Sequence, residues 1–477
     1  MKLSRRLFLV MSLWVSASPA QAGPAATSGA PAAANDALQG GGQGNPAQTM
    51  TVASAGSKVE LLQSGKDWTL QVDGKPFVVH GAGMGYTDEA GIARLAEAGG
   101  NAFRTWGTQH LDVQLAAAQR HGLKVLVGLD MQKQLQGFDY QDEEAVARQL
   151  KALQASIDRY RSHPGLLGWI IANEPNLMIG ADGAAVQPDP AVYEAMADVL
   201  DYIHEQDPDH PATVAFAFTA TLAEDVALAL QAMPALDFLS FQAYGALPVV
   251  PDLVQGLAVN LPYMVTEFGP LGHWEMPATQ WGREIEEPSG AKAVGLVERM
   301  QQAGLHDPQG QLLGGFAFLW GHKQERTPTW YGLFTEEGGR TAAVDELSRL
   351  WTGQYPRHRA PSAWGLTLNG EVAGASVSVL PASRLTASLQ VSDPDSDDLT
   401  VRWQVRKEVE LRSHGGHFEA RPDSVATQFS DHSRADDRHG VTLLAPVDPG
   451  HYRLYAWASD EQGGVATANF PFLVQPL

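Results

Sequence analysis

Two glutamates of this chain follow short apolar runs. Residues 166–172 are apolar and partly β-branched, as expected of a buried strand, and Asn173 and Glu174 come directly after them. Residues 263–266 form a second run of this kind, which leads into Glu267. Two carboxyl groups in such positions could divide acid/base and nucleophilic work if one is protonated at rest and the other is ionised. That is the combination a retaining glycosidase requires.

The elements that would position these glutamates repeat along the chain. Short apolar runs alternate with Ala-, Leu- and Glu-rich stretches, a pattern that predicts an α/β fold of parallel strands joined by right-handed helical crossovers. We expect strands at residues 77–80, 101–105, 124–129, 166–172, 213–218, 238–242, 263–266 and 315–319. We expect helices at residues 87–98, 111–121, 142–162, 190–206, 222–233 and 291–303. Eight such strands predict a closed (β/α)8 TIM barrel with catalytic groups at the carboxyl ends of its strands. A doubly wound sheet is the alternative, and the lack of a Gly-rich phosphate loop disfavours it.

Length and composition agree with a large barrel and a smaller second domain. The 477 residues exceed one ordinary domain, and 44% hydrophobic with 18% charged residues is typical of a protein that buries a core. A formal net charge of -21 argues against nucleic acid or an anionic membrane as a partner, because polyanions would be repelled. It is compatible with a neutral ligand such as a sugar. The chain has no cysteine, which excludes disulfides and a cysteine nucleophile.

The amino-terminal residues have the pattern of an export signal. Residues 1–22 combine a basic start, an apolar centre and a small-residue cleavage site, which predicts a signal peptide and a periplasmic or extracellular location. Residues 23–56 are rich in Ala, Gly, Pro, Ser and Gln, and they predict a disordered linker. No later segment has the roughly 20 apolar residues needed to span a membrane. The barrel would then occupy residues 57–358.

The pattern changes to alternating strands after residue 358. Four segments alternate apolar and polar residues: 384–391, 399–405, 451–458 and 466–473. They predict an accessory β-sandwich over residues 359–477. Its acidic segments 393–398 and 459–464 resemble loops of exported immunoglobulin-like modules of the PKD kind. Turn chemistry alone selects Asp and Gly, so we interpret both segments as turns, with a calcium site as the alternative.

Three segments of the predicted barrel carry a resemblance to a known family. They are Arg161-Ser-His-Pro-Gly-Leu-Leu-Gly-Trp-Ile-Ile-Ala-Asn-Glu174, Asn101-Ala-Phe-Arg104 and Pro262-Tyr-Met-Val-Thr-Glu-Phe-Gly269. Together they resemble glycoside hydrolases of clan A, and most of all the catalytic module of family 2. The resemblance extends over about residues 59–352. It implies a TIM barrel with one catalytic glutamate after strand four and one after strand seven.

The resemblance also implies roles for single residues. Glu174 would be the general acid/base, and Glu267 would be the nucleophile. Arg104 could hold Glu267 ionised through a charge-assisted hydrogen bond. Asn173 would contact the sugar 2-hydroxyl, and Tyr244 would hydrogen-bond the nucleophile.

Further residues follow predicted strands. Trp320 would be the sugar platform of the clan, with a core tryptophan as the alternative. Trp106 and His80 could line the cleft, and Gln242 stands where the clan often has a histidine. Other cleft candidates are Asp130, His273, Trp274, His322, Lys323, Trp330 and Tyr331. Five more glutamates do not end a strand and are interpreted as solvated loop charges: Glu275, Glu284, Glu286, Glu287 and Glu325.

These observations predict an exported retaining β-glycoside hydrolase that acts by double displacement on a β-linked oligo- or polysaccharide, for example a β-glucan. One alternative is a transglycosidase that remodels β-glucans with the same two glutamates. Another is a barrel that binds carbohydrate without cutting it. The histidine spacings give no indication of a catalytic metal, and no cofactor is expected. The sequence leaves sugar identity, linkage and oligomeric state open.

Overall fold

The computed structural model describes residues 56–85, 88–181, 183–305, 307–413 and 416–476. The predicted signal peptide and all of the predicted linker except Gly56 lie outside these residues. Among the helices that are described, none combines the length and the apolar character needed to cross a membrane.

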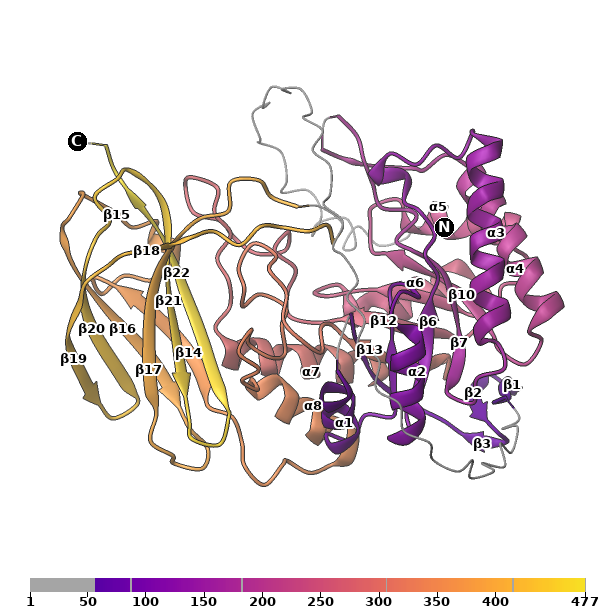
Figure 1. Ribbon diagram of the computed structural model, residues 1–477, viewed down its shortest axis with the longest axis horizontal. Helices are drawn as coiled ribbons and strands as arrows, with labels where there is room; N and C mark the ends of the chain where they lie inside the picture. The colour runs from indigo at the N-terminus through magenta and orange to yellow at the C-terminus, as the bar shows by residue number, and fades with distance from the viewer. Residues whose placement is uncertain (1–55, 86–87, 182, 306, 414–415, 477) are drawn as a thin grey trace, which may run out of the picture. The chain divides into compact units, whose positions relative to one another are not determined.

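Eight parallel strands form a closed barrel, as the sequence predicts (Figure 1). In chain order they are β4 (Val79–Gly83), β5 (Ala102–Arg104), β6 (Lys124–Gly128), β7 (Leu166–Asn173), β10 (Ala212–Ala217), β11 (Leu239–Gln242), β12 (Tyr263–Phe268) and β13 (Leu312–Ala317). Each strand pairs with the next one along the chain, and β13 pairs with β4 to close the ring. The carboxyl ends of all eight strands therefore meet at one edge.

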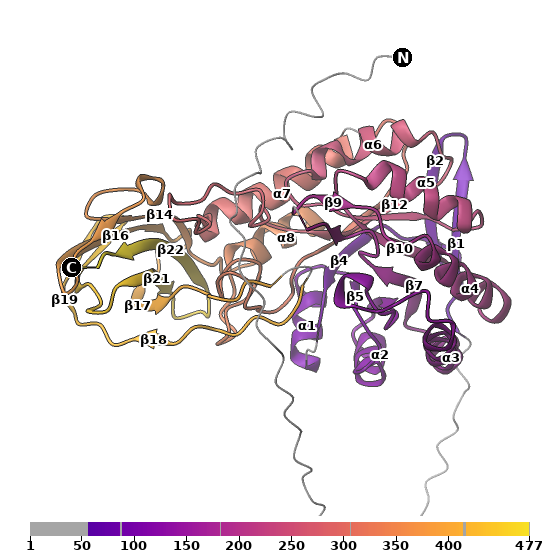
Figure 2. The ribbon, with the colours of Figure 1, turned by 90° about the horizontal axis from the view of Figure 1, so that it is seen from above.

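Helices follow the barrel strands and surround them (Figure 2). They are α1 (Glu89–Glu97), α2 (Leu111–Arg120), α3 (Glu143–Tyr160), α4 (Ala191–Gln206), α5 (Leu222–Ala232), α6 (Val250–Leu257), α7 (Ser289–Leu305) and α8 (Ala342–Thr352). Helix α3 begins where the Asp142 carboxylate accepts a hydrogen bond from Ala145 N at 3.0 Å, and Asp88 caps α1 in the same way. The sequence analysis missed α6 and α8. Pro251 and Gly256 weaken the helical pattern of α6, although Pro is favourable in a first turn.

A small antiparallel sheet covers the amino end of the barrel. It consists of β1 (Val59–Ser64), β2 (Asp67–Val72) and β3 (Lys75–Pro76). Leu70 and Val72 are buried in one hydrophobic cluster with residues that begin barrel strands, such as Val79 and Ala102. The sheet thus shields the apolar interior of the barrel at the end opposite the predicted site.

The carboxyl-terminal strands form two mainly antiparallel sheets, which pack around a second hydrophobic core. One sheet has the order β14 (Ser362–Leu368), β16 (Arg384–Ser392), β20 (Arg438–Leu444) and β19 (Phe429–Ala435). The other has the order β15 (Ser378–Val379), β22 (Val465–Val474), β21 (Gly450–Ser459), β17 (Thr400–Lys407) and β18 (Ser424–Val425). Leu389 of the first sheet and Leu454 of the second belong to one buried cluster. This arrangement fits the predicted all-β module.

Three of the glutamates interpreted as solvated charges are buried, so that interpretation was wrong for Glu284, Glu286 and Glu325. Glu286 pairs with Lys292, accepts a hydrogen bond from Thr329 Oγ1 at 2.8 Å, and also accepts one from Asn469 of β22. The sequence around Glu284 and Glu286 does not reveal that they bind Arg412 and Asn469, because these partners come more than 100 residues later in the chain.

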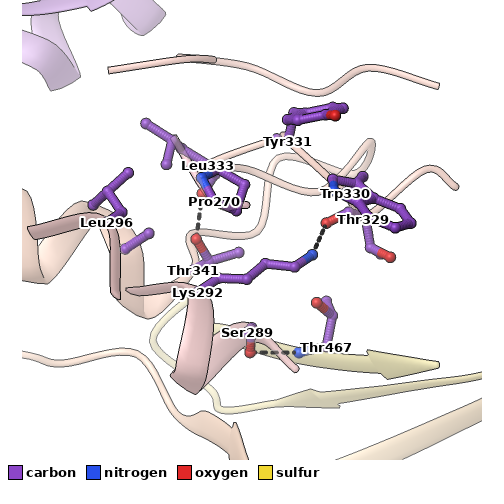
Figure 3. Close-up of a pocket in the computed structure, with 12 residues that line it drawn as sticks. Pro270, Ser289, Lys292, Leu296, Thr329, Trp330, Tyr331, Leu333, Thr341 and Thr467 are labelled. Carbon is purple, nitrogen blue, oxygen red and sulfur yellow. Dashed lines mark hydrogen bonds between the residues drawn. The ribbon is translucent and has the colours of Figure 1, made fainter. Parts of the chain in front are cut away.

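A small pocket lies beside this buried network (Figure 3). Lys292 donates to Thr329 O at 2.7 Å on one side of it, and Ser289 Oγ accepts a hydrogen bond from Thr467 N at 2.9 Å on another. Neither Glu174 nor Glu267 lines the pocket. The pocket therefore lies mainly between α7 and residues 329–333, and it is not part of the predicted site.

A substitution at Gly314 would test how closely the backbones of β13 and β4 approach each other. Its φ of +114° is rare for L-residues, and a Cβ at this position would lie 2.3 Å from Val79 O. We expect Gly314→Ala to lower the free energy of unfolding by about 2–5 kcal/mol in urea denaturation. Gly256→Ala in α6 is the control, since nothing lies within 4 Å of its added methyl, and it should stabilise by about 0.5–1 kcal/mol. A Gly314→Ala protein as stable as the wild type would contradict this packing.

Candidate active site

The carboxyl ends of four barrel strands supply the polar groups of the site. Arg104 ends β5, Asn173 ends β7, Gln242 ends β11, and Glu267 lies next to the last residue of β12. Gln242 is directly opposite Glu267 in the pairing of β11 with β12. Closure of the barrel brings these groups, which are far apart in sequence, to one edge.

The Glu267 carboxylate accepts hydrogen bonds from four side chains. Its Oε1 atom lies 2.8 Å from Trp106 Nε1, 2.9 Å from Gln242 Nε2 and 3.3 Å from Arg104 Nη1. Its Oε2 atom lies 2.9 Å from the Tyr244 hydroxyl. The structure thus shows the expected contacts of Arg104 and Tyr244 with Glu267, and it places Trp106 beside the same carboxylate. All four donors favour the ionised form of Glu267.

Asn173 is oriented by two of the same side chains. Its Oδ1 atom accepts a hydrogen bond from Gln242 Nε2 at 2.6 Å and one from Arg104 Nη2 at 2.8 Å. Arg104 and Gln242 therefore link Asn173 to Glu267, because each donates to both. With Oδ1 occupied in this way, the amide group of Asn173 has a fixed orientation.

Glu174 begins the loop that follows β7. Its φ of +52° is in the left-handed region, which is uncommon for a residue with a side chain, and its backbone N donates to Ala215 O of β10 at 2.7 Å. The next turn is held by buried Asn176, which exchanges side-chain hydrogen bonds with the Ala217 backbone at 2.9 and 3.0 Å. The Glu174 carboxylate forms an ion pair with Lys133, with Nζ and Oε2 3.2 Å apart.

Burial dominates the electrostatics of Glu267. Loss of solvation raises the pKa of the Glu267 carboxyl group, the charge of nearby Glu174 raises it too, and Arg104, Trp106 and Tyr244 oppose the rise. The net pKa of Glu267 lies above the ordinary glutamate value. Burial likewise raises the pKa of Tyr244 well above its ordinary value, so its hydroxyl remains a donor to Glu267. Among the groups that lower the pKa of Glu267, Arg104 has the largest effect, but the loss of solvation has a larger one.

An aromatic cluster surrounds the donors of Glu267. Phe318 packs edge-on against Trp106 with ring centroids 5.5 Å apart and against Tyr244 at 6.1 Å. Tyr331 packs against both Tyr244 and Phe318. Trp274 packs edge-on against Tyr244 and is 43% exposed, so it presents an aromatic surface to solvent at this edge.

The sugar-platform prediction for Trp320 is not supported. Trp320 is 3% exposed, its Nε1 atom donates to Gly91 O at 3.0 Å, and its ring packs against Phe334 and Trp351. It is a core tryptophan, the alternative weighed above. Phe318, two residues earlier, packs against Trp106 and Tyr244, two of the donors of Glu267.

The prediction for His80 is also wrong. We expected His80 to follow the first barrel strand, but β4 begins one residue before it and continues to Gly83. Its ring stacks on Trp351 of α8 with a centroid distance of 6.4 Å, so it faces the surrounding helices. The predicted strand ended a few residues too early, so His80 was expected at the site although it lies within the barrel wall.

Three residues of the site were missed or given no role. Lys133 lies in the loop after β6, and only its place after a predicted strand could have indicated it. Asn176 acts through backbone groups of β10, a partnership that the sequence does not reveal. Gln242 was identified only as a substitution, although its amide donates to both Asn173 and Glu267.

Within the described part of the chain, no group of possible metal ligands includes either glutamate of the site. Among the described residues, the group of carboxylates close enough to share a metal ion lies in the carboxyl-terminal strands and includes neither Glu174 nor Glu267.

Several proteins that are similar to this chain in sequence or structure have names of glycoside hydrolases. No family model matches the chain. The chain is 27% identical to the probable mannan endo-1,4-β-mannosidase C of Aspergillus terreus, in an alignment that covers 30% of this chain and 52% of that protein. The chain thus spans about half the length of this curated relative.

Solved structures with a similar fold have lower identity. A β-glucuronidase from Ruminococcus gnavus is 17% identical with a TM-score of 0.46, and the match covers 62% of this chain and 52% of that chain. A glycosyl hydrolase family 2 member from Bacteroides cellulosilyticus is 11% identical with a TM-score of 0.42, covering 88% and 65%. A family 1 β-glucosidase from Thermotoga maritima is 14% identical with a TM-score of 0.34, covering 48% and 76%.

The hydrogen bond from Tyr244 has a measurable electrostatic effect. Tyr244→Phe removes a donor to the ionised form of Glu267, so we expect the pKa of Glu267 to rise further. The titration can be followed by NMR with 13C-labelled glutamate, and Glu267→Gln identifies the signal. Tyr331→Phe is the control, since the Tyr331 hydroxyl accepts from His273 N and does not contact Glu267. An unchanged or lowered midpoint in Tyr244→Phe would show that this hydrogen bond does not stabilise the charge.

Proposed function

We propose that this chain is an exported retaining β-glycoside hydrolase that acts on β-linked polysaccharide. The observation that carries the proposal is the Glu267 carboxylate, which is buried among four donors at a strand end and lies close enough to Glu174 for the two charges to interact. A retaining mechanism uses two such carboxyl groups on either side of the scissile bond. Export rests on the signal-peptide pattern of residues 1–22.

In the proposed reaction, Glu267 attacks the anomeric carbon and forms a glycosyl ester. Three donors hold Oε1 and one holds Oε2, so Oε2 keeps more of its electron density and is the attacking atom. Glu174 donates its proton to the departing glycosidic oxygen. It then takes a proton from the water that cleaves the ester and releases Glu267 as a carboxylate.

The substrate would be positioned by neighbouring polar groups. Because Asn173 Oδ1 accepts from Arg104 and Gln242, its Nδ2 group is the donor that we assign to the 2-hydroxyl of the sugar. A hydrogen bond at that hydroxyl strengthens as positive charge develops on the ring. The mannan-hydrolysing activity in the name of the Aspergillus relative makes β-1,4-mannan one candidate substrate beside the β-glucans.

We expect Glu267→Gln and Glu174→Gln each to lower kcat by at least about 100-fold on natural polysaccharide, because each removes one of the two chemical roles. The wild type and both variants can be compared on β-linked mannans, glucans, xylans and galactans, with products identified by mass spectrometry. Glu298→Gln on the exposed face of α7 is the control and should keep full activity.

The same assay separates the competing functions. Products longer than the starting oligosaccharide would indicate transglycosylation. Unchanged hydrolysis by Glu267→Gln would rule out Glu267 as the nucleophile. Sugar binding without turnover by the folded wild type would favour a barrel that binds and does not cut.

A further inference from the structure

Three aspartates of the carboxyl-terminal strands lie together. Asp393 and Asp397 belong to the loop between β16 and β17, and Asp460 directly follows β21. One oxygen from each carboxylate lies within 4.8 Å of an oxygen from each of the others. Among the residues that the structure describes, no lysine or arginine forms an ion pair with any of the three. The cluster therefore holds negative charge without a cationic side chain to balance it.

In Asp393 and Asp460, only one of the two carboxylate oxygens accepts hydrogen bonds from the backbone. Asp393 Oδ1 accepts from Asp395 N at 2.8 Å and from Asp397 N at 3.1 Å. Asp460 Oδ1 accepts from Gln462 N and from Gly464 N, both at 2.7 Å. The second oxygens, Asp393 Oδ2 and Asp460 Oδ2, are buried and have no hydrogen-bond partner within the described part of the chain.

Burial makes these unpartnered oxygens costly. Asp460 is 9% exposed, so water cannot solvate its carboxylate well. Two acidic turns formed only by backbone hydrogen bonds would not require three carboxylates to gather within 4.8 Å of one another. A bound cation removes both the repulsion and the missing partners.

We propose that Asp393, Asp397 and Asp460 bind a calcium ion. The ligands are all carboxylate oxygens, with no nitrogen or sulfur donor, which favours a hard cation. Calcium binds oxygen at about 2.3–2.6 Å, so two of its ligands can lie about 5 Å apart, whereas magnesium holds ligands within about 4.2 Å of one another. The three carboxylate oxygens all lie within 4.8 Å of one another, which is inside the span of a calcium coordination sphere. Water would complete the coordination.

The ion would stabilise the contact between the carboxyl-terminal strands and the barrel segment that precedes α8. The loop that carries Asp460 pairs with this segment, since Arg340 N donates to Gly463 O at 2.9 Å and Val465 N donates to Arg340 O at 2.8 Å. Beyond α8, Arg359 N donates to Asp395 Oδ2 at 2.7 Å, in the loop that carries Asp393. The site contacts neither catalytic glutamate, so its role is structural and does not depend on the proposed function.

Calorimetric titration of the full chain with calcium chloride, after treatment with EDTA, tests this proposal. We expect one calcium ion per chain, tighter binding of calcium than of magnesium, and a higher melting temperature with calcium. Asp460→Asn keeps an oxygen for the backbone hydrogen bonds but loses the charge, so it should lose calcium binding. Asp397→Asn should do the same and is the substitute if Asp460→Asn does not fold, because Asp397 is only partly buried.

Asp398→Asn is the matched control. Asp398 lies in the same acidic loop, but it pairs with Arg434 and lies outside the cluster, so this variant should bind calcium as the wild type does. No calcium binding by the wild type would overturn the proposal. Equal binding by wild type, Asp397→Asn and Asp460→Asn would also overturn it, because the ion would then be bound elsewhere.

Discussion

The site depends on the burial of two opposite charges, Arg104 and Glu267, inside one edge of the barrel. Arg104 is fully buried, and desolvation lowers its pKa while Glu267 opposes that change. A charge buried in this way is tolerated only when it is paired and hydrogen-bonded, and loss of one partner costs about 3–5 kcal/mol. The guanidinium meets this requirement through Glu267, Asn173 and the carbonyl of Thr266. The same contacts that stabilise Arg104 therefore fix the positions of the groups that would perform the reaction.

The two glutamates are held in different environments. Glu267 is the second-last residue of the buried strand β12. It is 6% exposed and is surrounded by hydrogen-bond donors. Glu174 lies one residue beyond its strand, with a strained backbone and a lysine beside its carboxylate. Different surroundings are what two identical side chains need if one is to act as a nucleophile and the other as an acid and base.

The sequence was sufficient to predict the barrel, for a physical reason. Buried parallel strands require continuous apolar runs, and a polar residue that ends such a run must lie at the barrel edge, which is how Asn173 and Glu267 could be predicted. Arg104 was indicated only by the resemblance to a known family. The errors arose at the ends of strands, where the sequence does not show at which residue the strand begins or stops. Trp320 and His80 face the surrounding helices, while Phe318 faces the site. Buried Glu284 and Glu286 were taken for surface charges because their partners, Arg412 and Asn469, are more than 100 residues away.

The stereochemistry of the first product tests the central claim most directly. NMR of the hydrolysis of a β-linked oligosaccharide, recorded before the sugar mutarotates, reports the anomer that the protein releases. Double displacement at Glu267 predicts that the β-anomer forms first. Initial release of the α-anomer would mean direct attack by water, and Glu267 could not then be the nucleophile.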